Sequence, residues 1–285
     1  MNVEIKQLAP GLYFVATPIG TARDITLRAL DVLASADVIA AEDTRTARKL
    51  MDIHGIAVNG RPMIPYHDHN GETVRPKLLD LMQQGKSVAY ASEAGTPMVA
   101  DPGFGLARDA IAAGLLVTSA PGPSAVIAAL TIADLPTDRF LFAGFAPSTQ
   151  AARKKFFTEL ADIPATLAFY ESPKRIHKSL RDLTDVMGGE RSVAICRELT
   201  KRFEEVLRGS LDHLNTQLAE RTLKGEIVVV VDRDRAVATE MDLDETLKSA
   251  LSQMSVKDAA TVVSEALDLP RRQVYQAALA LGKSD

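Results

Sequence analysis

The sequence predicts an α/β protein with two α/β domains and a helical tail. Its 285 residues exceed the length of one typical domain, which is about 100–200 residues. Over residues 1–135 expected strands and helices alternate, which is typical of a parallel sheet with helices on both faces. Over residues 136–235 two expected strands follow one another without a helix between them, which indicates a mixed sheet. Residues 243–285 show only helical periodicity, after a charged linker at 233–242.

The composition is that of a soluble globular protein. Hydrophobic residues make up 46% and charged residues 25% of the chain. The net charge is −4, so a polyanionic partner must bind a local basic patch. The single cysteine, Cys196, excludes an internal disulfide and fits a reducing compartment. The N-terminus has no apolar signal region, and no apolar run approaches about 18 residues. We therefore expect a cytoplasmic protein without a membrane-spanning segment.

The elements of the first domain follow from apolar periodicity and turn residues. Buried strands are expected at 12–17, 37–41, 87–91 and 117–120. Helices are expected after 24, over 48–54, around 78–81, from 106 and over 124–132. Asp24 is expected to cap a helix whose apolar face carries Leu27, Leu30 and Leu33. Ser124 is expected to cap the last helix, and residues 66–70 form a polar, irregular piece.

Within residues 136–235, the segment 144–148 is expected to be the connection into the second unit. Helices are expected at 150–162 and 174–187, with a further helix capped by Ser210. Strands are expected at 166–170, 192–197, 203–209 and 227–231. The run 227–231 contains only isoleucine and valine, which favours a central strand. In the tail, two helices over 255–281 resemble a helix–turn–helix at 268–272, although two helices packed on the body fit equally.

Three of the expected strands end in a turn rich in glycine and proline, each with a threonine or serine. These are Thr17-Pro18-Ile19-Gly20, residues 92–103 and Ala120-Pro121-Gly122-Pro123-Ser124. Because ligands bind at the carboxyl ends of strands in open parallel sheets, the three turns are expected to line one pocket with backbone N–H groups and hydroxyls. Each turn taken alone also fits an ordinary strand-to-helix connection.

Other common sites are not indicated. No glycine-rich dinucleotide or Walker motif follows a strand. The group His67-Asp68-His69 is a weak metal signal, so we predict no metal site. Cys196 lies in an apolar strand pattern, which favours a buried thiol over a nucleophile.

Glu42-Asp43-Thr44-Arg45 ends a buried strand, where chemistry is usual in such sheets. The alternative is that Asp43 or Thr44 caps the next helix while Arg45 is solvated. Arg23, in the first turn, carries the same ambiguity.

The segment 153–181 is locally basic, with seven Lys or Arg against three acids. Such an excess can follow a phosphate backbone, and a solvated helix face explains it equally well. The residues considered for substrate contact are Arg23, Lys154, Lys155, Lys174 and Arg175.

Five motifs occur in the order and spacing of one known family. They are Thr17-Pro18-Ile19-Gly20, Glu42-Asp43-Thr44-Arg45, residues 92–102, Pro121-Gly122-Pro123-Ser124-Ala125 and Glu171-Ser172-Pro173-Lys174-Arg175. Over essentially its whole length the chain resembles the ribosomal RNA small subunit methyltransferase I family. That family belongs to the tetrapyrrole-methylase-like (class III) methyltransferases, which depend on S-adenosylmethionine.

The resemblance implies two α/β domains with S-adenosylmethionine in the cleft between them, and a homodimer. It also implies methylation of the ribose 2′-hydroxyl of a cytidine in the decoding region of small-subunit (16S) ribosomal RNA, with the RNA or the 30S subunit as partner. The residues that it assigns to the cofactor are Pro18, Gly95, Thr96, Val99, Ser124, Ala125, Tyr170 and Gly225. Glu93 stands where the family usually has aspartate, so we do not assign this carboxylate to the cofactor.

For the chemistry, a carboxylate near the 2′-oxygen would assist a hydroxyl that is a poor nucleophile while protonated. Glu42 and Asp43 are the candidates for that base, and Arg45 would orient ribose or phosphate. Two other functions remain open. A methylase of a corrin or porphyrin precursor shares the fold, and a non-catalytic RNA-binding assembly factor would bind RNA without consuming cofactor. The basic segment and the tail favour RNA over a tetrapyrrole.

Overall fold

The first sheet is parallel throughout, as predicted. The computed structural model describes residues 3–67, 69–233, 240–267 and 269–281. The strands of this sheet are β1 (Gly11–Val15), β2 (Val38–Ala41), β3 (Met63–Pro65), β4 (Ser87–Ala91) and β5 (Leu116–Ala120). Their order is β3-β2-β4-β1-β5, and every neighbouring pair is parallel. The short edge strand β3 was not predicted from the sequence.

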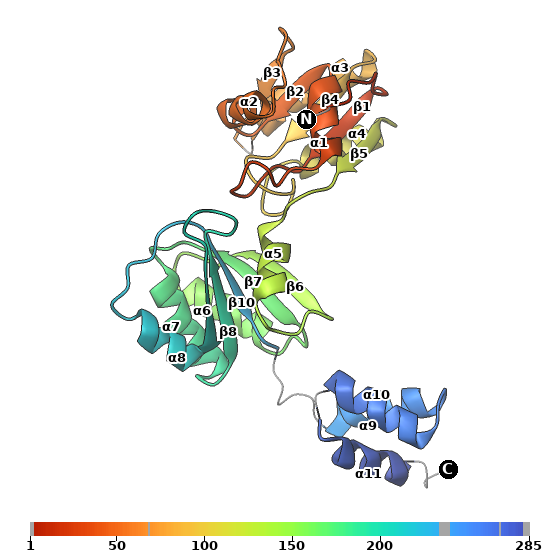
Figure 1. Ribbon diagram of the computed structural model, residues 1–285, viewed down its shortest axis with the longest axis vertical. Helices are drawn as coiled ribbons and strands as arrows, with labels where there is room; N and C mark the ends of the chain where they lie inside the picture. Colours follow the sequence, from red (N-terminus) through yellow and green to blue (C-terminus); the bar gives the residue numbers. More distant parts are fainter. Residues whose placement is uncertain (1–2, 68, 234–239, 268, 282–285) are drawn as a thin grey trace.

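Helices cover both faces of this sheet (Figure 1). They are α1 (Leu27–Ser35), α2 (Thr44–Ile53), α3 (Gly71–Gln83) and α4 (Phe104–Ala112). Alternate residues of the buried strands enter two separate hydrophobic clusters, one under α1 and α2 and the other under α3 and α4. The predicted Asp24 cap is wrong, because the side chain of Thr26 accepts the N–H of Ala29 and begins α1 there. Leu27 then falls on the solvent side and is 65% exposed.

Helix α5 (Ala125–Ile132) packs against the second sheet, although it precedes residue 136. Its buried residues Val126 and Ala129 share a cluster with Ala168 and Val228 of that sheet. Figure 1 accordingly shows α5 beside the second sheet, next to β6 and β7. Ser124 occupies the predicted N-cap position, but its side chain makes no capping hydrogen bond. The domain boundaries at 135 and 235 stay a prediction.

The second sheet is mixed, as predicted. Its strands are β6 (Phe140–Phe145), β7 (Thr166–Glu171), β8 (Ser192–Arg197), β9 (Glu205–Ser210) and β10 (Ile227–Val231). The order is β6-β7-β10-β8-β9, so the valine-rich strand β10 is central. Only β6 and β7 are parallel neighbours. Strand β6 was missed because its irregular register and its glycine hide the strand pattern.

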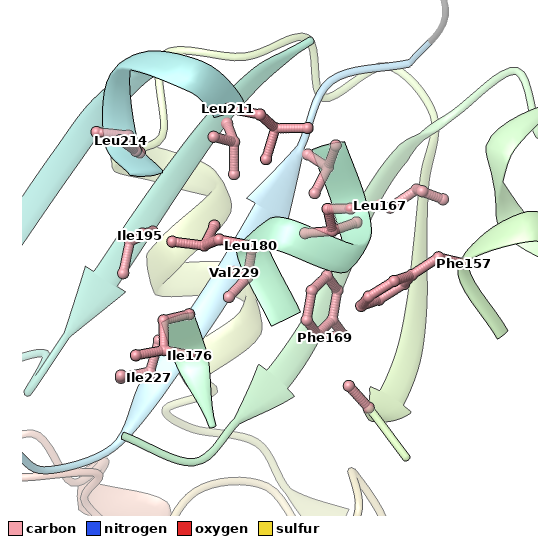
Figure 2. Packing of buried hydrophobic residues seen from close by; sticks show 14 of the residues in the cluster. Phe157, Leu167, Phe169, Ile176, Leu180, Ile195, Leu211, Leu214, Ile227 and Val229 are labelled. Carbon is pink, nitrogen blue, oxygen red and sulfur yellow. The ribbon is translucent and has the colours of Figure 1, made fainter. Parts of the chain in front are cut away.

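Three helices cover one face of this sheet: α6 (Gln150–Ala161), α7 (Ile176–Met187) and α8 (Leu211–Leu218). Their apolar residues form the largest core with the inward residues of β7, β8 and β10 (Figure 2). Phe157 of α6 contacts Phe169 of β7, with ring centroids 5.4 Å apart. Ser210 caps α8 as predicted, since its hydroxyl accepts the N–H of His213 at 3.3 Å.

The tail consists of α9 (Glu240–Leu251), α10 (Val256–Leu267) and α11 (Arg271–Leu281). These helices bury a small core of their own, formed by Leu243, Leu247, Ala260, Val263, Val274 and Ala278. Asp268, in the predicted turn, and most of the predicted linker lie outside the described residues. Among the helices that the structure describes, none is long and apolar enough to cross a membrane.

Candidate functional site

A cavity of about 730 Å³ lies between the two sheets. From the first sheet it is lined by the segments that follow β1, β2, β4 and β5, which all leave the carboxyl edge. The second sheet contributes the ends of β6, β7 and β8 and the beginning of β10. All eight residues that the resemblance assigned to the cofactor line this cavity: Pro18, Gly95, Thr96, Val99, Ser124, Ala125, Tyr170 and Gly225. The topology therefore brings together residues that lie more than two hundred positions apart.

The three glycine- and proline-rich turns form one connected wall. Thr17 and Gly95 exchange two backbone hydrogen bonds, each 2.9 Å long. The Thr96 hydroxyl donates to the Pro123 carbonyl at 2.8 Å and so joins the second turn to the third. The N–H of Gly95 is used in this bridge, so at this residue the expected ligand-binding donor is already engaged. At Gly95 the turn therefore contributes to the shape of the wall and not a free N–H.

Two glycines of the wall need the backbone freedom of glycine. Gly95 has φ +82°, and a Cβ there would lie 3.3 Å from Cγ2 of Ile19. Gly225 has φ +86°, and its Cβ would lie 2.3 Å from Cδ of Glu198. Side chains are disfavoured at such φ values. A substitution at either residue would therefore disturb the wall directly.

The second domain supplies the aromatic part of the cavity. Tyr170 packs edge-on against Phe145, with ring centroids 5.1 Å apart, and both line the cavity. Burial, together with the nearby Asp101 and Glu226 carboxylates, raises the pKa of Tyr170 to about 12. Its hydroxyl therefore stays protonated at neutral pH and is no candidate for a base. Cys196 is fully buried, and burial raises the pKa of its thiol to about 11, which agrees with the interpretation as an unreactive thiol.

Carboxylates dominate the charge of the cavity. Its lining contains Glu42, Glu93, Asp101, Glu171 and Glu226, against a single lysine. That lysine, Lys201, has its Nζ 2.9 Å from Glu198 and 2.7 Å from Glu226. The lining of the cavity thus carries an excess of negative charge, which favours a cationic ligand.

The three residues predicted for the chemistry at the end of β2, Glu42, Asp43 and Arg45, have two kinds of surroundings. Glu42 is half-buried and lines the cavity. Asp43 is the N-cap of α2, where it accepts the backbone N–H of Arg45 at 2.8 Å and pairs with the Arg45 guanidinium. These bonds hold the pKa of Asp43 at about 2. The Arg45 side chain is 90% exposed and does not line the cavity. The alternative of a helix cap with a solvated arginine thus describes Asp43 and Arg45, and the chemical role of Glu42 stays a prediction.

The basic segment is largely compensated by acids, some of which lie beyond residue 181. Lys154 pairs with Asp185 at 2.6 Å, and Lys155 lies 3.8 Å from Glu159. Arg175 pairs at 2.8 Å with Glu171, whose side chain is fully buried. The exposed Lys174 directly follows Pro173 of the cavity lining.

Two further basic residues have different surroundings. Arg23 is exposed on the turn after β1. Arg153, counted in the basic segment, is only 2% exposed and forms a buried pair with Asp182. Its charge is therefore not available to a phosphate backbone.

Sequence reasoning missed the loop after β8, where Leu199 and Lys201 line the cavity. Because β8 runs parallel to β7, the rule that strand carboxyl ends bind ligands would have indicated it. Glu198 and Thr200 have positive φ values of 52° and 62°, which no sequence pattern reveals. Of the weak metal signal, Asp68 lies outside the described residues. Within the described part of the chain, no group of three His, Cys, Asp or Glu side chains is arranged to hold a metal ion.

Comparison with known proteins agrees with this architecture. The family model described as Tetrapyrrole (Corrin/Porphyrin) Methylases matches residues 11–215, and the model described as RsmI C-terminal HTH domain matches 237–282. The chain is similar to a solved cobalt precorrin-4 methyltransferase, with a TM-score of 0.59, 19% identity and coverage of 78% of this chain and 94% of that one. It is also similar to a solved diphthine synthase, with a TM-score of 0.60, 16% identity and coverage of 78% and 89%. At such identities these two structures indicate the fold alone.

The sequence relatives are much closer. The chain is 46% identical to a ribosomal RNA small subunit methyltransferase I from Mesorhizobium japonicum, over 98% of this chain and 95% of that one. It is 42% identical to a protein of the same name from Vibrio cholerae, over 96% of each chain. This chain therefore belongs to the ribosomal RNA small subunit methyltransferase I family, within the tetrapyrrole methylases.

Proposed function

We propose that this protein transfers a methyl group from S-adenosylmethionine to the ribose 2′-hydroxyl of a cytidine in the decoding region of small-subunit ribosomal RNA. The observation that carries the proposal is the cavity between the two sheets, lined by all eight residues that the family resemblance assigns to the cofactor. Family membership supports the broader activity, methyl transfer to small-subunit ribosomal RNA with S-adenosylmethionine as the methyl donor.

The residues of the cavity fit this cofactor in size and charge. A volume of about 730 Å³ is within the range of small-molecule sites, about 300–1,000 Å³. S-adenosylmethionine carries positive charge on its sulfonium and amino groups, which suits the carboxylates of Glu42 and Asp101. Val99 and Tyr170 offer apolar surface for its ring. When bound, the cofactor supplies a methyl group already activated on sulfur.

With the methyl group activated, the protein's tasks are to align the 2′-oxygen and to accept its proton. A rigid cavity contributes most to the rate by holding the 2′-oxygen at about 3–3.5 Å from the methyl carbon. For the proton we assign Glu42, because it is half-buried and lines the cavity. Asp43 is the weaker candidate, since its carboxylate is engaged by Arg45 and its pKa of about 2 makes it a poor base.

The RNA is assigned to basic groups near the mouth of the cavity. Lys174 follows directly on the cavity lining, and Arg23 is exposed on the first turn. Lys154, Lys155 and Arg175 are ion-paired, so we expect each to contribute less. The tail, which matches a helix–turn–helix family model, is assigned to docking on the RNA or the 30S subunit. We expect the active species to be a homodimer, as the family resemblance implies.

The proposal is tested by methyl transfer in vitro. Purified protein is incubated with S-adenosylmethionine and with small subunits from cells that lack this protein, and nucleosides are then analysed by mass spectrometry. Appearance of 2′-O-methylcytidine is the expected result. A base-methylated nucleoside would contradict the 2′-hydroxyl assignment and leave the broader activity intact.

Two controls separate the remaining functions. Naked ribosomal RNA in place of subunits identifies which of the two is the substrate. RNA binding without any methylated nucleoside would favour a non-catalytic assembly factor. Methyl transfer to a porphyrin precursor but not to RNA would favour a tetrapyrrole methylase.

A further inference from the structure

We infer that the loop between β8 and β9, residues 198–204, docks an unpaired nucleotide of the RNA substrate, with Phe203 as the stacking surface and Arg202 beside it. The inference rests on the proposed function, because it takes RNA as the substrate. It assigns a role to two residues that the cavity lining itself does not include.

The loop lies at the junction of the two α/β units, beside the cavity. Leu199 and Lys201 line the cavity, and Arg202 and Phe203 follow them directly along the loop. Thr200 also contacts the first unit, where its hydroxyl accepts the N–H of Thr21 at 3.1 Å and its carbonyl accepts the Thr21 hydroxyl at 2.5 Å. In Figure 1 the end of β8 that leads into this loop points toward the first sheet, as does the beginning of β10. A group exposed on this loop therefore lies close to where a substrate must enter.

The base of the loop is held in a fixed conformation. Glu198 and Thr200 both have positive φ, a conformation that non-glycine residues adopt rarely and that is common at functional sites. Lys201 is fixed by Glu198 and Glu226. The Glu204 carboxylate accepts the N–H of Thr200 at 2.5 Å and closes the loop. The side chains at its tip are thus presented by a rigid support, which lowers the cost of ordering them on binding.

The tip presents an aromatic ring and a cation together. Phe203 is 64% exposed, so its ring contributes little to the hydrophobic core. The Arg202 guanidinium lies 5.4 Å from the ring centroid, within cation–π distance. Arg23 is exposed two residues beyond Thr21, on the turn that contacts this loop. An exposed aromatic ring with an arginine against it is a combination with which proteins hold unstacked bases and their phosphates.

The test measures RNA binding and methyl transfer of Phe203→Ala in the full-length protein. The probes are a fluorescein-labelled single-stranded RNA of mixed sequence and intact small subunits. We expect RNA affinity to fall by about 5- to 150-fold, the effect of losing one base–aromatic stack. The affinity for S-adenosylmethionine is expected to stay within about twofold. Phe203→Tyr, which keeps the ring, is expected to retain wild-type affinity.

The matched control is Ile111→Ala. Ile111 is 63% exposed, near the carboxyl end of α4, at the edge of the first sheet away from the cavity. Its removal is expected to leave RNA affinity unchanged. Arg202→Gln is expected to flatten the dependence of log affinity on log salt by about 0.7, the slope for one phosphate of a single strand.

Three results would overturn the assignment of the loop. They are an RNA affinity of Phe203→Ala within twofold of wild type, an equal loss in the Ile111→Ala control, or a parallel loss of S-adenosylmethionine affinity. Failure of the proposed function is seen separately, as an absence of methylated nucleoside with the wild-type protein. In that case the ratio of the RNA affinities of wild type and Phe203→Ala still shows whether the loop binds RNA.

Discussion

Replacing Asp182 with alanine is expected to lower the free energy of unfolding by about 3–5 kcal/mol, because it leaves a buried charge without its partner. Arg153 and Asp182 join α6 to α7, and both side chains are only 2% exposed. Arg153 Nε and Nη2 donate to one carboxylate oxygen at 2.8 and 2.5 Å. Nη1 donates to the carbonyls of Pro147 and Ser148, so the guanidinium also fixes the segment after β6. At about 2–4 °C per kcal/mol, the loss corresponds to a melting temperature lowered by about 6–20 °C.

The same two helices provide the control. Lys154 and Asp185 form a second pair between α6 and α7, but their side chains are 39% and 55% exposed. Asp185→Ala is expected to cost about 0–1 kcal/mol, the usual range for a surface pair. Thermal unfolding and urea unfolding followed by circular dichroism measure both variants. Equal effects of the two substitutions would refute the argument that the Arg153 charge is structural and buried.

Other predictions concern the site and the assembly. Glu42→Gln is expected to lower the single-turnover rate by about 10²–10⁴-fold, the usual contribution of a general base, while Asp43→Asn keeps the helix cap and most of the rate. Near-wild-type rates in both variants would contradict the role of Glu42 as a base, and alignment of the 2′-oxygen would then account for catalysis. Lys174→Gln is expected to flatten the salt dependence of RNA affinity by about 0.7–0.9, and an unchanged slope would return this residue to an ordinary solvated surface. Deletion of residues 243–285 is expected to weaken binding to the small subunit and to spare cofactor binding, as calorimetry and filter binding would show. Light scattering is expected to give a dimer, and a mass of 30.7 kDa at micromolar concentration would contradict that.

Local patterns were enough to predict most of the fold. The strands at 87–91, 192–197 and 227–231 occur at the predicted residues, because each is a short apolar run bounded by turn residues. Strand β6 was not predicted. Gly144 interrupts its apolar run, and its register with β7 shifts between Phe142 and Phe145. The cap of α1 was misplaced because Asp24 and Thr26 are both good caps, and only the packing of the chain selects between them.

The residues at the strand ends of the site could be predicted from the sequence. The ion pairs that engage the basic residues could not. The turns around Gly95 and Ser124 lie at the carboxyl edge of the first sheet, so topology brings them to the cavity. The net charge of the basic segment overestimated the free positive charge on its surface. Two of its residues are paired with Asp182 and Asp185, which lie after the segment in the sequence. Ion pairs between two helices depend on how the helices pack, so the net charge of a sequence segment does not predict them.

If the cavity between the sheets holds S-adenosylmethionine, calorimetric titration of glycine variants with this cofactor detects it. Gly95 and Gly114 have similar positive φ values, +82° and +70°, but only Gly95 lies at the cavity. An added Cβ at Gly114 would meet nothing within 4 Å. Alanine at either residue therefore introduces a similar backbone strain, and only one of the two changes the wall.

Wild type and Gly114→Ala are expected to bind the cofactor alike and to gain about 2.7 kcal/mol of stability at 100 times Kd. Gly95→Ala is expected to remain folded and to lose this binding, since the wall there must stay close to the ligand. Absence of binding to the wild-type protein, or equal binding by Gly95→Ala, would contradict the assignment of the cavity.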